Sequence, residues 1–438
     1  MLMWRSGSKA LKCVLSVVVV MVLSHAVSAE NWPQWRGPSF SGVSTEKSVP
    51  TTWSKNENVA WRTVLPGAGG ATPVVWGDHI FVTSVTEEGD LVLVCVGADG
   101  KPMWQKKVGS GDKKVRGDEG NMASPSPCTD GEHVWAMMGT GDIACFDFAG
   151  TEVWKDKLQN RYGKDGKFSI QFGMSSSPVL YDGRLYLQLI HGEGNPTTRE
   201  AVVVCLDAAT GKEVWKVYRP SDGTDENEHS YASAILYKSD KTTFLITHGA
   251  DYTVAHNLRD GSELWRVGGL LNPKTKYDRT LRFVASPAIA PGLIVIPTAK
   301  GGPVVAISPD SKGMVTDKES GVLWTRPKTP DVPSPLIHDG LVYLCMENGV
   351  IQCADAKTGE EIYQKRAVSD RYRASPVYAD GHVYVAARKG IVTVFKAGRE
   401  FEQVATNDVG EALSASLAIS NGRIYLRTFD ALWAIGSK

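Results

Sequence analysis

The chain has 438 residues, with 48 Lys+Arg against 48 Asp+Glu, 44 Gly and 13 Trp. Because a chain with no net charge has no electrostatic attraction to a phosphate backbone, the composition argues against nucleic acid as a partner. The hydrophobic fraction of 42% and the charged fraction of 22% are those of an ordinary globular protein, which excludes a disordered or collagen-like chain.

The N-terminus has the pattern of a secretory signal peptide. Basic residues precede an apolar run over residues 13–23, and small residues follow up to a cleavage site near Ala29. The run is shorter than the ~20 apolar residues that span a bilayer, and we expect no transmembrane segment elsewhere. No cysteine stands at the cleavage site, which argues against a lipid anchor. We therefore predict that residues 1–29 are a signal peptide and that the protein is periplasmic or secreted.

A short pattern returns eight times along the rest of the chain. Each copy starts with Ser or Thr, usually before Pro, and continues with a tight turn of Gly, Asp or Asn and a β-branched or aromatic run, which predicts a β-hairpin. The eight starts are Thr72-Pro73, Ser124-Pro125, Ser177-Pro178, Ser233-Ala234, Ser286-Pro287, Ser334-Pro335, Ser375-Pro376 and Ser416-Leu417.

A third strand and an outer strand with a large aromatic residue complete each copy. The outer aromatic residues are Trp61, Trp104, Trp154, Trp215, Trp265 and Trp324, with Tyr363 and Phe401 as substitutes. This repetition predicts an all-β fold, an eight-bladed β-propeller of four-stranded antiparallel blades. Because Trp61 precedes the first start, we expect residues 58–65 to form a strand that pairs with the last blade. Such closure makes residues 30–438 a single domain.

The turn before the outer strand resembles that of a known family. Residues 206–215 read Leu-Asp-Ala-Ala-Thr-Gly-Lys-Glu-Val-Trp, and residues 354–363 are a second near-complete copy. They resemble the tryptophan-docking repeat of the PQQ-like, or quinoprotein-type, β-propellers, and the Asn-Trp-Pro-Gln-Trp-Arg-Gly-Pro of residues 31–38 resembles the opening of secreted bacterial members. The resemblance covers the mature chain and implies the fold, whereas the function varies among dehydrogenases, assembly scaffolds and sensor domains.

We predict that the outer aromatic residues are structural. An indole on the outer strand buries a large area between neighbouring blades and donates its N–H to a backbone carbonyl, and a glycine in the turn permits close approach.

The resemblance to catalytic PQQ dehydrogenases implies a planar quinone over the propeller axis, a Ca²⁺ ion held by carboxylate and amide oxygens, and an Asp base. Many of those enzymes also carry a disulfide between adjacent cysteines. This sequence has no adjacent cysteine pair, and no position matches the catalytic Asp or the calcium ligands. Zinc-ligand spacing and the Gly-x-Ser-x-Gly elbow are also absent from the sequence. We therefore assign no catalytic residue and expect neither a metal nor a cofactor, with PQQ and Ca²⁺ as the alternative.

The mature chain keeps six cysteines. They are Cys95, Cys128, Cys145, Cys205, Cys345 and Cys353. Four of these share one position of the third strand in different copies, which predicts buried thiols. A two-residue turn at residues 348–349 pairs Leu344 with Cys353, so we expect no disulfide between Cys345 and Cys353.

The connections that precede each start converge on one mouth of the channel, and they are polar. The candidate ligand-binding residues there are Arg116, Glu119, Asn121, Gln171, His229, Tyr231, Arg282, Asp331, Arg371 and Arg373. Arginine, tyrosine, carboxylate and amide groups around a channel suit an anionic planar cofactor, a sugar or a peptide tail. The acidic stretch that includes Glu228 is interpreted as a solvated loop, and His229 as an exposed side chain or an acid-base group.

We expect a non-catalytic, extracytoplasmic and monomeric binding or scaffold module that engages a protein or a carbohydrate. The alternative is a PQQ- and Ca²⁺-dependent oxidoreductase that acts on an alcohol or sugar at the channel mouth. A third hypothesis is a protein that resembles the outer-membrane β-barrel assembly lipoprotein, also an eight-bladed propeller, without its lipid-anchor cysteine.

Overall fold

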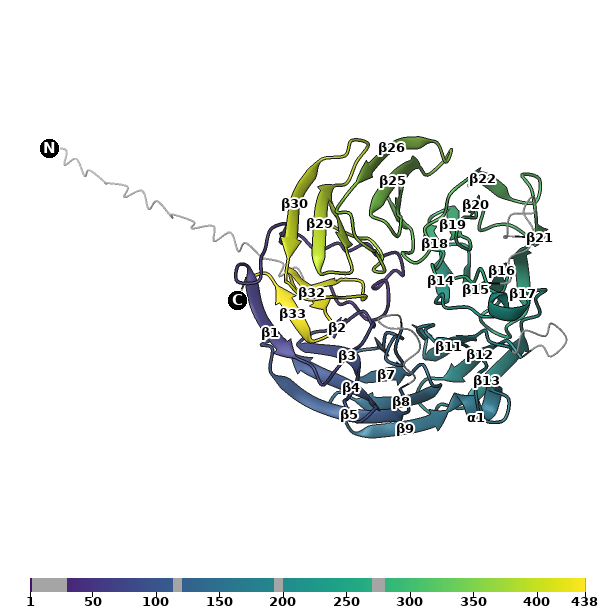
Figure 1. Cartoon of the computed structure of the whole chain (residues 1–438), viewed down its shortest axis with the longest axis horizontal. Helices are drawn as coiled ribbons and strands as arrows, with labels where there is room; N and C mark the ends of the chain where they lie inside the picture. Colours follow the sequence, from purple (N-terminus) through teal and green to yellow (C-terminus); the bar gives the residue numbers. More distant parts are fainter. Residues whose placement is uncertain (2–29, 113–119, 193–199, 270–279, 438) are drawn as a thin grey trace.

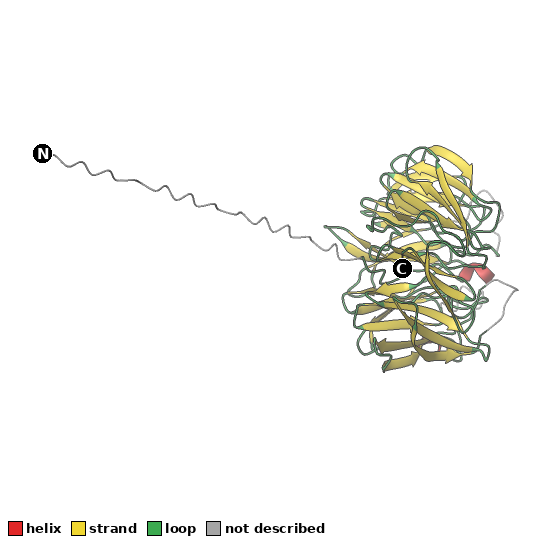
Figure 2. Cartoon of the chain, turned by 90° about the vertical axis from the view of Figure 1, so that its left-hand side faces the viewer, coloured by secondary structure: helices red, strands yellow, loops and turns green. Residues whose placement is uncertain are grey.

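The computed structural model describes residue 1 and residues 30–112, 120–192, 200–269 and 280–437. Eight sheets stand in a ring around a central axis (Figure 1), and the side view shows their strands crossing the thickness of the ring (Figure 2). The predicted eight-bladed propeller is confirmed. Among the described residues, no helix has the length and apolar character that a bilayer span requires.

The blades are numbered in chain order, with the strands of each running from the axis outward. Blade 1 consists of β2 (Val74–Trp76), β3 (His79–Val85), β4 (Asp90–Gly97) and β5 (Pro102–Ser110). Blade 2 consists of β6 (Cys128–Thr129), β7 (His133–Met137), β8 (Asp142–Asp147) and β9 (Glu152–Lys157), followed by the short helix α1 (Leu158–Tyr162). Blade 3 consists of β10 (Val179–Tyr181), β11 (Arg184–Leu189), β12 (Val202–Asp207) and β13 (Glu213–Tyr218), followed by the 3₁₀ turn η1 (Asp225–Glu228). Blade 4 consists of β14 (Ile235–Lys238), β15 (Thr243–Gly249), β16 (Tyr252–His256), β17 (Glu263–Val267) and β21 (Gly313–Val315).

The second half of the ring repeats the arrangement. Blade 5 consists of β18 (Ala288–Ala290), β19 (Leu293–Pro297), β20 (Val304–Ile307) and β22 (Val322–Arg326). Blade 6 consists of β23 (Leu336–His338), β24 (Leu341–Cys345), β25 (Val350–Asp355) and β26 (Glu361–Arg366). Blade 7 consists of β27 (Val377–Ala379), β28 (His382–Ala386), β29 (Ile391–Lys396) and β30 (Gln403–Asp408). Blade 8 consists of β31 (Ala418–Ser420), β32 (Arg423–Arg427), β33 (Ala431–Ile435) and β1 (Val59–Val64).

The first strand of the chain closes the ring. β1 pairs antiparallel with β33, with Trp61 opposite Ala434, so the predicted strand over residues 58–65 does complete the last blade. Blade 4 departs from the predicted four strands, because β21 adds a fifth strand that runs parallel to β17, with Gly313 opposite Trp265. β21 belongs to the long connection between β20 and β22, which reaches back over the outer edge of blade 4 and covers it.

A chain of hydrogen bonds runs around the axis at the start of the inner strands. Seven backbone N–H groups, from Thr72 to Ser375, each donate to the hydroxyl of the next blade over 2.9–3.0 Å, in the order Thr72, Ser126, Ser177, Ser233, Ser286, Ser334, Ser375 and Ser416. The second start was expected at Ser124-Pro125, and the structure corrects it to Ser126-Pro127. The sequence carries two Ser-Pro pairs in a row, and only the second one has the register of the ring.

The segment before β1 crosses the face of the ring that carries the turns between first and second strands (purple in Figure 1). The backbone of Trp32 pairs with that of Val75 in β2 over 2.9 Å in both directions. Arg36 is 3% exposed, and it donates to the carbonyls of Pro335 over 2.7 Å and Pro376 over 2.9 Å. This segment therefore ties blade 1 to blades 6 and 7 across the axis.

The cysteine positions follow from the strand register. Cys95, Cys145, Cys205 and Cys353 each lie opposite the outer-strand aromatic residue of their own blade, and all six cysteines of the described residues are buried, free thiols. The expected pairing of Leu344 with Cys353 was wrong. Tyr343 faces Cys353 instead, because the turn between β24 and β25 has four residues and not two.

Phe401 does not occupy the outer-strand position that was expected for it. It precedes β30 and packs on Phe395, with the ring centroids 5.0 Å apart. The position that corresponds to the tryptophans of the other blades is Ala405, which lies opposite Val394.

Candidate functional site at the mouth of the central channel

A cavity of about 210 Å³ lies where the inter-blade connections meet at the axis. It is lined by residues from the connections of all eight blades and from two hairpin turns of the same face. These are Gly70, Gly120, Asn121, Ser124, Phe172, Ser175, Tyr231, Arg282, Val284, Val332, Arg371, Arg373, Arg388, Ser414 and Phe429. The cavity is at the small end of ligand sites, so it suits a small molecule or the tip of a larger partner.

Four arginines give the cavity its charge. Arg282 comes from the connection between β17 and β18, Arg371 and Arg373 from that between β26 and β27, and Arg388 from the hairpin between β28 and β29. Among the described lining residues there is no Asp or Glu. The site therefore carries positive charge in a protein whose total charge is balanced.

Carboxylates behind the lining hold two of these arginines in place. Arg282 forms an ion pair with Glu226 at 2.6 Å, and Arg373 lies 3.5 Å from Glu347. Asp331 lies behind the cavity, where burial and the neighbouring Glu347 carboxylate raise its pKa. These anchored guanidinium groups are presented in fixed orientations, which lowers the entropy lost on binding.

Aromatic rings form the other part of the wall. The Arg282 guanidinium lies 4.8 Å from the centre of the Phe172 ring, and Phe172 meets Tyr231 edge-on at 5.6 Å. Arg388 lies 4.3 Å from the centre of the Phe429 ring and donates to the hydroxyl of Ser414. Stacking on aromatic faces holds these guanidinium groups in place, and the planar guanidinium is the group that pairs best with a planar anion such as a carboxylate.

The structure brings together half of the predicted site residues. Asn121, Tyr231, Arg282, Arg371 and Arg373 line the cavity. Arg116 and Glu119 lie outside the described residues.

The other three predicted residues lie elsewhere. Gln171 is exposed and Asp331 stands behind the wall. The exposed position expected for His229 is wrong: its side chain is buried, Nε2 lies 3.0 Å from the Gly192 carbonyl, and burial lowers its pKa. Glu228, expected on a solvated loop, is 5% exposed. A polar loop sequence does not reveal that its residues fold back between two blades.

Sequence reasoning missed Arg388 and Phe429. Both lie in turns between the second and third strands, whereas the prediction considered only the connections between blades. These turns reach the same face, because the strands of a blade alternate in direction. In the sequence, Arg388-Lys389-Gly390 stands between two apolar runs, and this pattern was the available signal for a turn that carries an arginine to this face.

The lining residues do not fit a calcium ion. Ca²⁺ takes six to eight oxygen ligands, mostly from carboxylates and carbonyls. The described lining offers no carboxylate and places four arginines there, and no group of three or more His, Cys, Asp or Glu residues suited to a metal occurs in the described ranges. The carboxylates of PQQ suit the arginines, but the described lining offers no donor set for an accompanying cation.

The ring of eight blades with docking indoles defines a PQQ-like β-propeller. The family model described as outer membrane protein assembly factor BamB matches residues 139–313 and 311–428. The chain therefore belongs to this family. No curated protein matches the sequence at a significant level.

Solved structures of two kinds share the fold. The chain is 14% identical to BamB from Moraxella catarrhalis, with a TM-score of 0.57 over 83% of this chain and 93% of that one. It is 14% identical to the quinohemoprotein alcohol dehydrogenase of Comamonas testosteroni, with a TM-score of 0.68 over 93% and 81%. The quinohemoprotein alcohol dehydrogenase ADHIIG of Pseudomonas putida HK5 is 13% identical, with a TM-score of 0.62 over 93% and 80%. At such identities, the likeness shows the fold alone.

Proposed function

We propose that this protein is a non-catalytic, extracytoplasmic binding module that captures a carboxylate group of a protein or carbohydrate partner at the channel mouth. The observation that carries the proposal is the convergence of four arginines on a cavity whose described lining has no Asp or Glu. Planar guanidinium groups bind carboxylates through paired hydrogen bonds. The signal-peptide pattern of residues 1–29 supports a location outside the cytoplasm.

A scaffold role agrees with the way in which the arginines are held. Glu226 and Glu347 fix Arg282 and Arg373 from outside the cavity, which prepares a binding surface, and the part of the lining that the structure describes offers no carboxylate to act as a base. The family model is named after an assembly factor, and such a factor works by contact with other proteins.

A quinone-dependent oxidoreductase is the second candidate. It is favoured by one observation, since the arginines also suit the carboxylates of PQQ and two structures of the same fold are named quinohemoprotein alcohol dehydrogenases. It requires calcium ligands from outside the described lining.

The test uses residues 30–438 and calorimetric titration with citrate, a citrate trimethyl ester and PQQ with and without Ca²⁺. We expect saturable citrate binding, no binding of the ester, and a loss of about tenfold or more in affinity when Arg371 and Arg373 are both changed to Gln. Arg399→Gln, which changes an arginine whose side chain is 64% exposed and paired with Asp355 at 3.2 Å, is the matched control.

Two outcomes contradict this proposal. Equal binding of citrate and its ester would show that the arginines do not select carboxylates. Calcium-dependent PQQ binding with dye-linked oxidation of an alcohol or sugar would make the protein an enzyme and establish the second candidate.

A further inference from the structure

A second and larger hollow, of about 630 Å³, lies away from the axis between blades 1 and 2. Its walls are the end of β5, the turn before β8, the strand β9, and α1 with the loop that follows it. We call it the lysine groove, after the side chains of Lys107, Lys155, Lys157 and Lys167 that line it with Asp142 and Gln159. It lies on the same face as the channel-mouth cavity but shares no lining residue with it.

The rim of the groove is basic. Lys107 pairs with Asp90 at 2.5 Å, and Lys155 donates to the backbone carbonyl of Lys107 over 3.1 Å. Lys157 and Lys167 are exposed and have no carboxylate partner among the described residues. Four lysines against one lining carboxylate leave a local positive excess on a chain that is neutral overall.

The floor of the groove offers hydrogen-bond acceptors. The Asp142 side chain is 4% exposed, and Oδ2 accepts a hydrogen bond from the Thr140 hydroxyl over 2.6 Å. A carboxylate accepts about four hydrogen bonds, so the floor retains acceptor capacity. The Oε1 atom of Gln159 is also buried, and no described residue donates a hydrogen bond to it. Buried acceptors of this kind gain free energy when a ligand supplies donors.

Glycines make room for these acceptors. A Cβ at Gly109 would lie 2.6 Å from Oδ2 of Asp142, so only glycine fits beside this carboxylate. A Cβ at Gly141 would lie 2.7 Å from Oε1 of Gln159 and 2.5 Å from the Phe168 ring, and its φ of +96° favours glycine as well. The acceptors and the half-buried ring therefore occupy a shaped floor.

We propose that the lysine groove binds an anionic carbohydrate, a chain that carries carboxylates among its hydroxyls. The lysine ammonium groups pair with the carboxylates, the sugar hydroxyls donate to Asp142 and Gln159, and the Phe168 ring offers an apolar face for a sugar ring. An acidic peptide fits less well, because its side chains bring acceptors and like charge to the Asp142 carboxylate. A sugar acid brings donors next to each carboxylate.

The test titrates residues 30–438 with tetragalacturonate, with maltotetraose as the neutral sugar and tetraglutamate as the acidic peptide. We expect saturable binding of tetragalacturonate that weakens with added salt, and much weaker binding of the other two. Changing Lys155 and Lys157 together to Gln is expected to lower the affinity about tenfold or more. Lys365→Gln, an exposed lysine on the outer strand of blade 6, is the matched control and is expected to change nothing.

The variant Asp142→Asn distinguishes specific binding of a carbohydrate from non-specific ionic attraction of any anion. It removes a negative charge from a basic groove, so non-specific attraction of any anion would increase. A floor that accepts hydroxyl donors predicts weaker tetragalacturonate binding instead, with the unfolding temperature as the check on folding. Tighter tetragalacturonate binding in this variant, equal binding of tetraglutamate, or no tetragalacturonate binding would each overturn the proposal. These titrations are made in the channel-mouth variant, with Arg371 and Arg373 changed to Gln, so that a carboxylate bound by the cavity arginines is not counted as binding in the groove and the two sites fail separately.

Discussion

At the scale of single residues, the blades depend on a small side chain opposite a large one. Across the outer strand pair, Cys205 lies opposite Trp215 and Ala255 opposite Trp265. A cysteine serves here as a small apolar residue. Burial raises the pKa of the equivalent Cys95 thiol to about 12, so it stays protonated and unreactive at neutral pH.

The docking indoles differ in one respect that can be measured. The N–H of Trp215 donates to the Leu258 carbonyl over 2.9 Å, and a Cβ at Gly261 would lie 2.7 Å from this indole. Trp265 is 1% exposed and its N–H has no partner among the described residues. The reason lies in the next blade, where the long connection that contains β21 replaces the tight turn.

We therefore predict that Trp215→Phe destabilises the protein more than Trp265→Phe. Both changes remove similar apolar area, but only the first leaves a carbonyl without its donor, a difference of about 1 kcal/mol in the free energy of unfolding. Denaturant titration of the two variants and the parent measures it. Equal losses would mean that the indole N–H contributes nothing to docking.

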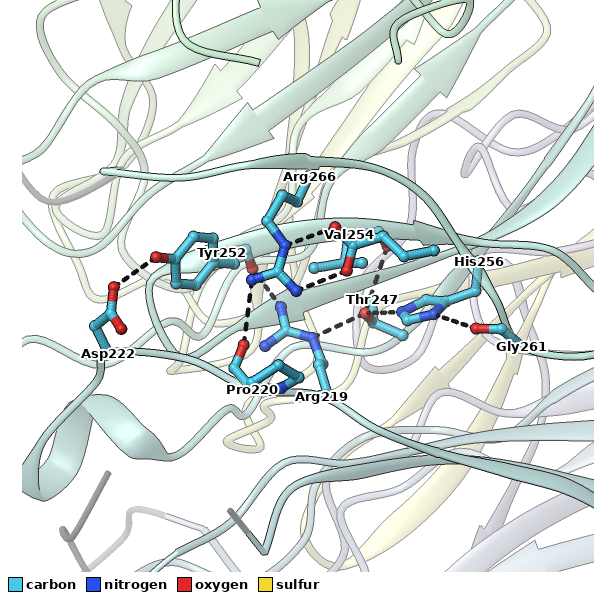
Figure 3. A network of polar contacts seen from close by, with 10 residues as sticks. Arg219, Pro220, Asp222, Thr247, Tyr252, Val254, His256, Gly261 and Arg266 are labelled. Atoms are coloured by element: carbon cyan, nitrogen blue, oxygen red, sulfur yellow. Dashed lines mark hydrogen bonds and ion pairs between the residues drawn. The ribbon is translucent and has the colours of Figure 1, made fainter. Parts of the chain in front are cut away.

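At the scale of elements, blades 3 and 4 are joined by a buried polar network (Figure 3). Arg219, at the end of β13, is 2% exposed and donates to the Thr247 hydroxyl over 3.0 Å and to the Tyr252 carbonyl over 2.6 Å. The Thr247 hydroxyl lies 3.0 Å from Nε2 of His256. Burial lowers the pKa of Arg219 to about 9, which still leaves it charged at neutral pH. The Arg219 cation therefore lies next to a buried histidine, and the Glu263 carboxylate opposite His256 offsets only part of its effect.

This network predicts loss of stability in mild acid. Burial lowers the pKa of His256 to about 4 and that of His248 to about 3, and the charge of Arg219 acts in the same direction. Because both pKa values lie below the ordinary value near 6.5, the unfolded chain binds protons first as the pH falls. Stability is fully present above pH 6.5 and declines toward pH 4, by about 1.4 kcal/mol per unit of pKa difference for each histidine. Unfolding temperatures measured from pH 7.5 to pH 4 test this.

The matched variant is His256→Gln, which keeps a polar side chain without a titrating ring. Its unfolding temperature is expected to depend less on pH over the same window, and amide exchange in the parent at pH 4.5 is expected to lose protection first in β15 and β16. A parent protein with constant stability down to pH 4 would contradict the assignment.

Some elements of the structure could be predicted from the sequence, and others could not. The blades were predictable, because each copy repeats the same starts, turns and outer aromatic residues. The place of the connections was also predictable, because each joins an outer strand to the next inner strand and so ends at one mouth of the channel, and Arg282, Arg371 and Arg373 do line the cavity there. The extra strand β21 and the burial of His229 were not predictable, because they depend on how a long, non-repeating segment folds against a neighbouring blade.

At the scale of the whole molecule, two sets of contacts between distant parts of the chain stabilise the ring. β1 completes the last blade, and the hydrogen-bond chain of inner hydroxyls passes from blade to blade around the axis. The segment before β1 adds a third link across the face opposite to the cavity. Because every blade touches its neighbours and the ends are paired, we expect the ring to unfold as one unit.

Arg36 tests this cooperativity. It is buried against the carbonyls of Pro335, Pro376 and Ser41, and a Cβ at Gly42 would lie 2.6 Å from its guanidinium carbon. Arg36→Met keeps the apolar volume but leaves these carbonyls without donors, which is expected to cost about 3 kcal/mol. If the segment is part of one cooperative unit, calorimetry of Arg36→Met shows a single transition at a lower temperature, and Arg399→Met shows no change. If the segment folds independently of the ring, the opposite result is expected. The ring would then unfold at the same temperature as in the parent protein, and protease would cleave only the residues before β1.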